Sequence, residues 1–155
     1  MDQTLLRSYF ATVYEFGSDT GLVRASIDGE LVKDASVLPP LLGQPFAILT
    51  AYNPRSMLLP RRVNEARHVV LRDLLVLGCY RVEHCVGYED EPESAFREPS
   101  WLVHGIDRDE AIQFGRTFRQ NTILYSRAGN PELIVTDPTA DPLGKTYTGN
   151  WRLRG

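Results

Sequence analysis

The chain has 155 residues, of which 43% are hydrophobic and 24% are charged, and its formal net charge is -3. This size and composition are typical of one globular domain whose core is large enough to fold without disulfides. The acidic balance argues against nucleic-acid binding, which usually needs a basic face, and no apolar run is long enough to span a membrane.

The N-terminal part of the chain predicts a short helix followed by a hairpin. Residues 4–9 are the helix candidate, and residues 11–16 and 21–27 are strand candidates separated by a Gly-Ser-Asp turn. The first residues lack the cationic start and long apolar core of a secretory signal. Residues 30–44 are rich in turn-forming residues and are predicted to form a connection or a short helix.

The next stretch is the best candidate for a functional site. Residues 46–52 are apolar and aromatic-rich, which predicts a buried strand, and Pro54 ends it because proline cannot donate to a sheet ladder. Asn53, Arg55 and Ser56 therefore lie at the carboxyl end of a strand, where open sheets commonly bind ligands. The alternative is a plain strand-to-helix turn with an Asn-Pro signal and solvated arginines.

The clearest helix prediction covers residues 61–77, and Gly78 follows as a C-terminal signal. Glu65, His68 and Arg72 fall on one side of this helix, so His68 is expected to face solvent. The other side carries the apolar residues that recur at helical spacing, which are Val63, Ala66, Val70, Leu74 and Leu77.

Four strands and a second helix are predicted in the rest of the chain. The strand candidates are residues 80–86, 101–106, 123–125 and 133–135. Asp107 and Glu110 form a capping-box-like start for the helix, whose apolar face includes Phe114 and Phe118. The acidic segment 89–93 is expected to be a solvated hairpin connection.

Residues 46–126 thus run strand, helix, strand, strand, helix, strand. This order predicts an α+β fold: a ferredoxin-like split β-α-β-β-α-β antiparallel sheet with two helices on one face. We expect the N-terminal hairpin and a C-terminal strand to extend the sheet. Residues 1–136 are predicted to form a single domain, and residues 137–155 a C-terminal tail that either drapes over the domain or stays mobile.

A set of motifs in this order resembles the bacterial domain-of-unknown-function family 3293. The resemblance spans roughly residues 9–125 and implies a list of polar positions, because the family has no established activity. The motifs are Tyr9-x-x-Thr12-x-Tyr14, the run at 48–56, Asn64, Gly78-x-Tyr80, Glu98-Pro99-Ser100-Trp101 and Phe118-x-Gln120-Asn121.

The polar positions near predicted strand ends form the candidate ligand site. If they converge, they offer amide groups, one guanidinium and one carboxylate, which suits a small polar or anionic, nucleotide-like molecule. The candidate ligand-binding residues are Asn53, Arg55, Ser56, Asn64, Glu98, Ser100 and Gln120.

Glu98 is the one carboxylate we nominate for catalysis, as a general acid or base beside Ser100. The alternative is that Glu98 braces the turn before Trp101, and the sequence leaves open whether the protein is an enzyme. His104 lies too far along the same strand face to act as a base for Ser100.

No metal or cofactor is expected. Cys79, His84 and Cys85 do not have the spacing of a zinc site, because two cysteines six apart on one strand lie far from each other. The sequence has no phosphate-binding or dinucleotide-binding glycine motif. Two cysteines also provide no disulfide framework, which favours a cytoplasmic location.

The first functional hypothesis is therefore a small-molecule-binding domain with its ligand near the Asn-Pro-Arg-Ser turn. The alternative is a protein-protein interaction or regulatory module that assembles through a sheet edge and has no catalytic activity. A homodimer is compatible with either. Single-stranded nucleic-acid binding through Tyr52, Tyr80 and Trp101 is disfavoured by the net negative charge.

Overall fold

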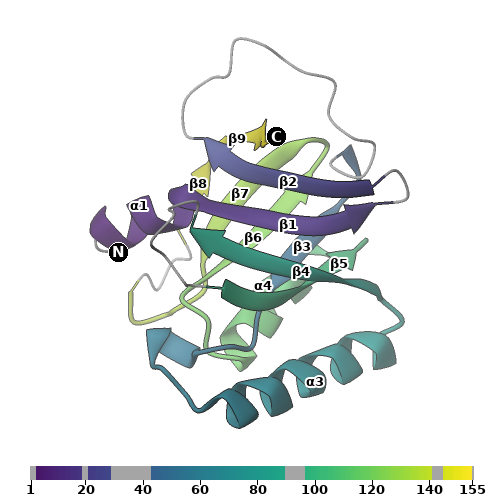
Figure 1. Ribbon diagram of the computed structural model, residues 1–155, viewed down its shortest axis with the longest axis vertical. Helices are drawn as coiled ribbons and strands as arrows, with labels where there is room; N and C mark the ends of the chain where they lie inside the picture. The colour runs from purple at the N-terminus through teal and green to yellow at the C-terminus, as the bar shows by residue number, and fades with distance from the viewer. Residues whose placement is uncertain (1–2, 19–20, 29–42, 90–96, 141–144, 155) are drawn as a thin grey trace.

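In the computed structural model, the described residues are 3–18, 21–28, 43–89, 97–140 and 145–154. They form a nine-stranded antiparallel sheet that curls into a nearly closed barrel, accompanied by helices (Figure 1). The described helices are α1 (Gln3–Ala11), α3 (Arg61–Leu77) and α4 (Arg108–Thr117), with a 3-10 turn η1 (Pro54–Ser56). The strands are β1 (Thr12–Ser18), β2 (Gly21–Asp28), β3 (Phe46–Leu49), β4 (Arg81–Glu89), β5 (Arg97–His104), β6 (Thr122–Arg127), β7 (Asn130–Val135), β8 (Thr146–Thr148) and β9 (Asn150–Leu153).

The strand order is β8-β7-β6-β3-β5-β4-β1-β2-β9. Both the N-terminal hairpin and the last two strands belong to this sheet, in which β8 pairs with β7 and β9 pairs with β2. The predicted connection at 30–44 falls mostly on residues 29–42, and the predicted acidic loop mostly on residues 90–96. Both segments lie outside the described residues.

The predicted ferredoxin-like α+β fold is wrong. That fold covers only one face of an open sheet with helices, whereas this sheet closes around its other face to make a second core. The inner core contains buried side chains from eight strands, mostly aromatic and aliphatic, and no residue of α3 or α4. The continuous apolar run of β3 already indicated burial on both faces, because a strand with one solvent-exposed face alternates apolar and polar residues.

The strand β3 shows how the two cores are separated. All four of its residues are buried, and successive side chains point to opposite faces of the sheet. Phe46 and Ile48 face the interior of the barrel, whereas Ala47 and Leu49 face the helices. Because β3 pairs with β5 on one side and β6 on the other, both of its edges are also hydrogen-bonded.

Trp151 lies on β9, near the C-terminus, and its side chain helps to close the barrel. Its ring stacks on Phe46 with centroids 5.9 Å apart, and its Nε1 donates a hydrogen bond to Ser126 Oγ at 3.0 Å. Both partners lie on strands from the middle of the sheet, so the indole crosses the interior. The link between β8 and β9 also contacts β7, where Gly149 N donates to Pro131 O.

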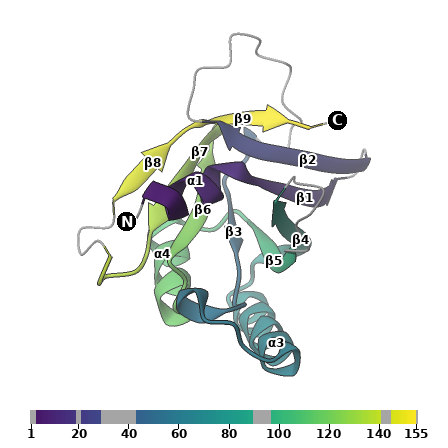
Figure 2. The same ribbon diagram turned by 60° about the vertical axis from the view of Figure 1, so that its left-hand side comes forward.

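The helices cover different parts of the barrel. Helices α3 and α4 lie together on the outer face of the central strands, and α1 lies at the opposite side against the inner core (Figure 2). Tyr9 and Phe10 anchor α1 to that core. Helix α4 begins as predicted, because the Asp107 side chain accepts a hydrogen bond from Asp109 N at its N-cap.

Helix α3 has the predicted bounds but the opposite orientation. Its buried residues are Asn64, Leu71 and Leu75, and His68, expected to face solvent, stacks on the buried Trp101 with ring centroids 4.2 Å apart. The predicted apolar face is the exposed one. Leu77 is 80% exposed, and Val63, Val70 and Leu74 are also exposed.

This orientation predicts different costs for two leucines on one helix. Leu75→Ala removes a fully buried side chain and should lower the free energy of unfolding by about 2–5 kcal/mol. Leu77→Ala, its matched control, removes an exposed side chain and should change it by less than about 0.5 kcal/mol. Urea denaturation of the two variants measures both values, and equal costs would contradict the orientation of α3.

Candidate functional site

A cavity of ≈ 230 Å³ lies inside the barrel beneath α1. Its deeper wall is apolar and includes Ile48 and Leu124 of the inner core, whereas the remaining wall is rich in hydroxyl, amide and carboxylate groups. The side chain of Leu58, 87% exposed, marks the rim. The lining residues are Ser8, Tyr9, Thr12, Tyr14, Ile48, Thr50, Asn53, Ser56, Leu58, Gly87, Glu89, Glu98, Ser100, Gln120, Asn121, Thr122, Ile123 and Leu124.

Gly87 creates part of this space. Gly87 lies on β4, which pairs with β1 on one side and with β5 on the other. Its partner on β1 is Tyr14, and its partner on β5 is Glu98. A Cβ atom at Gly87 would meet only ordinary contacts, 3.4 Å to Thr12 and 3.7 Å to Tyr14. Glycine in a strand interior weakens the strand and often marks a place where a ligand approaches closely, and here its missing side chain widens the cavity in front of Glu98.

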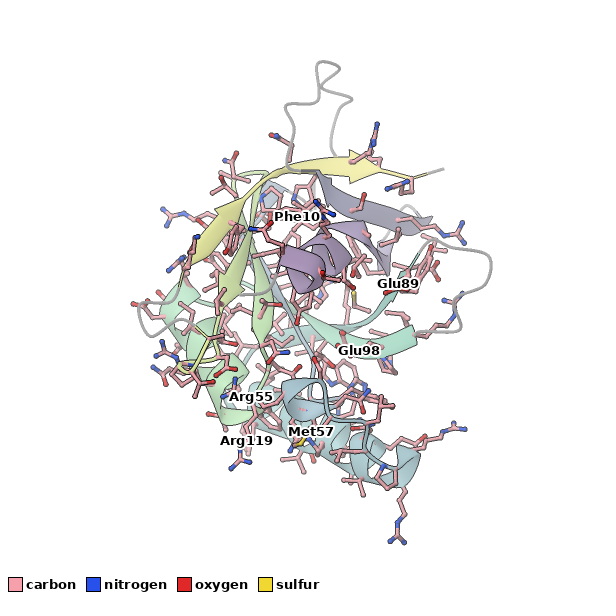
Figure 3. All side chains as sticks on the ribbon, turned by 90° about the vertical axis from the view of Figure 1, so that its left-hand side faces the viewer. Phe10, Arg55, Met57, Glu89, Glu98 and Arg119 are labelled. Carbon is pink, nitrogen blue, oxygen red and sulfur yellow. The ribbon has the colours of Figure 1, made fainter. Side chains whose placement is uncertain are left out.

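Glu98 is one of the two carboxylates that line the cavity, and Figure 3 labels it together with Glu89. Burial raises the pKa of Glu98 to about 7, and a hydrogen bond from the Thr50 side chain acts in the opposite direction. Among the described residues, no arginine, lysine or histidine forms an ion pair with Glu98. Near neutral pH, Glu98 therefore exchanges readily between its neutral and ionised forms.

Two tyrosines face the same space. Burial raises the pKa of Tyr9, although its hydroxyl is within hydrogen-bonding reach of the side chains of Asn121, Thr122 and Ser56. Burial also raises the pKa of Tyr14, and the Glu98 charge contributes to both shifts. Tyr14 is only 9% exposed, and among the described residues its hydroxyl has no hydrogen-bond partner. Both tyrosines stay protonated at neutral pH and can donate hydrogen bonds.

The Asn-Pro-Arg-Ser segment forms one side of the cavity in a constrained conformation. Asn53, Arg55 and Ser56 all have positive φ, at 45°, 55° and 60°, which is unfavourable for residues other than glycine. Asn64 holds the segment from α3, since its Oδ1 accepts from Asn53 N at 2.9 Å and its Nδ2 donates to Asn53 Oδ1 at 2.8 Å. Buried and fully engaged, Asn64 positions the loop and does not line the cavity.

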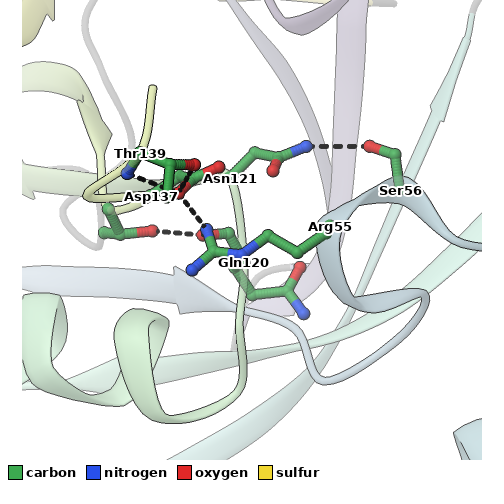
Figure 4. A network of polar contacts seen from close by, with 7 residues as sticks. Arg55, Ser56, Gln120, Asn121, Asp137 and Thr139 are labelled. Carbon is green, nitrogen blue, oxygen red and sulfur yellow. Dashed lines mark hydrogen bonds and ion pairs between the residues drawn. The ribbon is translucent and has the colours of Figure 1, made fainter. Parts of the chain in front are cut away.

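Arg55 is engaged on the other side of the loop (Figure 4). Its Nη1 lies 2.9 Å from Asp137 Oδ1 and 3.4 Å from the carbonyl oxygen of Gln120. Burial acts to raise the pKa of Asp137, but hydrogen bonds from Thr139 and the charge of Arg55 lower it below its usual value. Asn121 ties the same loop to β6 through its Nδ2, which donates to Ser56 Oγ at 2.8 Å.

The structure therefore brings together five of the seven candidate ligand-binding residues. Asn53, Ser56, Glu98, Ser100 and Gln120 line the cavity. Arg55 and Asn64 do not line it, because Arg55 turns toward Asp137 and Asn64 braces the loop from outside. Glu98 lies within β5 and faces the cavity.

The sequence reasoning missed the contribution of the N-terminal segment. Tyr9, Thr12 and Tyr14 line the cavity, and so does Asn121. These positions belong to the motifs that carried the family resemblance, so the signal was present. Gly87 had no such signal, because the space it leaves depends on its strand neighbours.

The aromatic residues considered for nucleic-acid binding lie on the other side of the sheet. Trp101 is buried between the rings of His68 and His84, and Tyr52 packs edge-on against His68. Burial lowers the pKa of His68 to about 4, so the His68 imidazole is neutral near pH 7. No base could stack on Trp101 without opening the packing of α3.

A barrel with a polar cavity at one end, covered by an N-terminal helix, is the class of structure that these observations define. The model of the family DUF3293, described as a protein of unknown function, matches residues 49–123 and confirms the resemblance predicted from the sequence. Searches of the curated proteins and of the solved structures gave no match. Within the described residues, no helix is both long and apolar enough to cross a membrane.

The raised pKa of Glu98 predicts a specific pH dependence of stability. A folded-state pKa of about 7, above the ordinary 4.5, means that this carboxyl stabilises the fold fully below about pH 4.5 and that the contribution is lost as the pH rises through 7. Glu98→Gln should therefore be more stable than wild type at about pH 8, by roughly 1–3 kcal/mol, and the difference should shrink as the pH falls, to less than about 0.5 kcal/mol near pH 4.5.

Denaturant unfolding at several pH values measures this difference. Glu65→Gln, which removes an exposed carboxylate on α3, controls for the loss of one negative charge. A Glu98→Gln difference that stays constant between about pH 5 and 8 would show that Glu98 is not desolvated in the folded protein.

Proposed function

We propose that this protein binds a small polar molecule in the cavity under α1. The observation that carries this proposal is the composition of the cavity wall: an apolar floor at Ile48 and Leu124 beneath a ring of hydroxyl, amide and carboxylate groups. Ligand sites commonly combine these two features, because apolar surface supplies affinity and a few fixed polar groups supply orientation.

The cost of maintaining the cavity also supports a binding role. The interior of a barrel this size is normally filled by side chains. Here a glycine stands where a larger residue would fit, and polar groups occupy a wall next to the inner core. Asn53, Arg55 and Ser56, in the turn on the same side of the cavity, adopt unfavourable backbone angles, and such strain tends to be retained at functional sites.

The charges favour a different ligand from the one expected from the sequence. The anionic ligand was expected because of Arg55, whose guanidinium is paired with Asp137. The described residues that line the cavity include Glu89 and Glu98 but no arginine or lysine. An anion placed there would be repelled by Glu98 whenever that carboxyl is ionised, so the proposed ligand is polar and is not an anion.

The nearly closed barrel favours ligand binding over assembly through a sheet edge. The end strands β8 and β9 are short, with three and four residues. Short end strands offer few unpaired backbone groups to a partner strand.

The proposal predicts that filling the cavity abolishes binding without harming the fold. Gly87→Val places a larger side chain in front of Glu98 with only ordinary contacts at its Cβ. Because valine suits a strand better than glycine, the free energy of unfolding should stay the same or rise by up to about 1 kcal/mol. Fragments that raise the melting temperature of wild type should not affect this variant.

Gly17→Val is the matched control, since Gly17 lies in β1 with open space around its Cβ. A thermal-shift screen of neutral, cationic and anionic fragments against the three proteins makes the comparison. The proposal is wrong if fragments stabilise Gly87→Val as much as they stabilise wild type and Gly17→Val.

A further inference from the structure

Glu98 is the feature of the cavity that the simple binding proposal leaves unexplained. A carboxylate facing a cavity is costly unless a partner compensates it. The described residues supply only the Thr50 hydroxyl, which already hydrogen-bonds to Pro99 O at 3.0 Å. The Arg55 guanidinium, which lies near this end of the barrel, is held by Asp137.

Among the residues that the structure describes, the charged and titratable groups around Glu98 do not provide the missing positive charge. Tyr9 faces it from α1 and Tyr14 from β1, and both phenols are uncharged at neutral pH. Glu89 on β4 lines the same cavity and adds a second carboxylate, which accepts a 3.4 Å hydrogen bond from Ser8. The field in the cavity is therefore negative whenever Glu98 is ionised.

The remaining polar groups suit a ligand with hydroxyl groups. Tyr14, nine-tenths buried, lines the cavity with a hydroxyl that has no partner among the described residues. Gln120 uses its Nε2 on the carbonyl oxygens of Tyr52 and Phe118, which leaves its Oε1 as an acceptor. Ser100 and Thr122 add further hydroxyls to the wall.

We propose that the ligand is a small organic cation, a hydroxylated ammonium compound whose positive charge is held by Glu98. This inference rests on the proposed function and specifies the class of molecule bound. An ammonium group beside Glu98 replaces the water that the carboxylate loses on burial, and it forms charge-assisted hydrogen bonds in a poorly solvated site. The ligand hydroxyls then pair with Tyr14 and the amide groups.

Binding of a cation must be coupled to the release of a proton. The cation favours the ionised form of Glu98, which is about half populated near pH 7 in the free protein. By linkage, the apparent affinity should rise about tenfold between pH 6 and pH 8, and an ammonium compound with a much higher pKa stays charged throughout.

Three matched compounds test the inference: an aminocyclohexanol, a cyclohexanediol and a hydroxycyclohexanecarboxylate. They share a ring and a hydroxyl group and differ in charge. Methyl NMR follows Ile48 and Leu124 in the cavity wall, with Leu71 and Leu75 on the buried face of α3 as references outside the cavity. The ammonium compound should shift the cavity methyls most strongly, more so at pH 8 than at pH 6, and should lose at least tenfold in affinity in Glu98→Gln.

The outcomes separate this inference from the proposed function. If the diol or the carboxylate shifts the cavity methyls as strongly as the ammonium compound does, or if Glu98→Gln binds the ammonium compound equally well, the cation assignment is wrong and the cavity remains a ligand site. If none of the three shifts Ile48 or Leu124, the cation assignment is wrong, whereas the proposed function is decided by the fragment screen on wild type, Gly87→Val and Gly17→Val. Glu65→Gln, with its exposed carboxylate far from the cavity, should behave as wild type.

Discussion

The whole structure depends on the burial of β3 on both of its faces. Four consecutive buried residues send two side chains into the barrel and two toward the helices, so one short strand separates both cores. Such a strand needs apolar cover on both faces, and here helices cover one face while the rest of the sheet wraps around the other. The first need is met by α3 and α4, and the second by the hairpin of β1 and β2 and by Trp151, which reaches across the interior to Phe46. The barrel follows from that requirement.

The candidate site lies where this packing scheme changes character. Along β5 the interior positions run from the apolar Leu102 through Ser100 to Glu98, and Ile48 on β3 is followed by Thr50 on the same side. The interior therefore passes from apolar to polar along the barrel, and Gly87 leaves space at the transition. Asn64 and the Arg55–Asp137 ion pair hold the adjoining loop in strained backbone angles. Residues that never touch the cavity thus fix the shape of its wall.

The local elements could be predicted from the sequence, whereas their closure could not. The bounds of α3 and the Asp107 cap follow from periodicity and capping chemistry, which act over one or two turns. The orientation of α3 could not be predicted, because Val70 and Leu74 are as apolar as Leu71 and Leu75, and only the sheet decides which pair is buried. Closure depends on Trp151, over a hundred residues from Phe46. For the site, the motifs of the family resemblance supplied Glu98 and Gln120, which line the cavity. Strand-end reasoning assigned Arg55 to a ligand, because the sequence does not show that Asp137 lies beside it.

The contact between Trp151 and Phe46 is the most direct test of this account, because an open sheet would not bring β9 to β3. Nuclear Overhauser effects measured on the protein in solution report this contact. The account predicts cross-peaks between the indole of Trp151 and the ring of Phe46, whose centroids are 5.9 Å apart, and slow solvent exchange of the indole N–H bonded to Ser126. A fast-exchanging indole with no contact to Phe46 would contradict the nearly closed barrel and remove the enclosure on which the proposed ligand site depends.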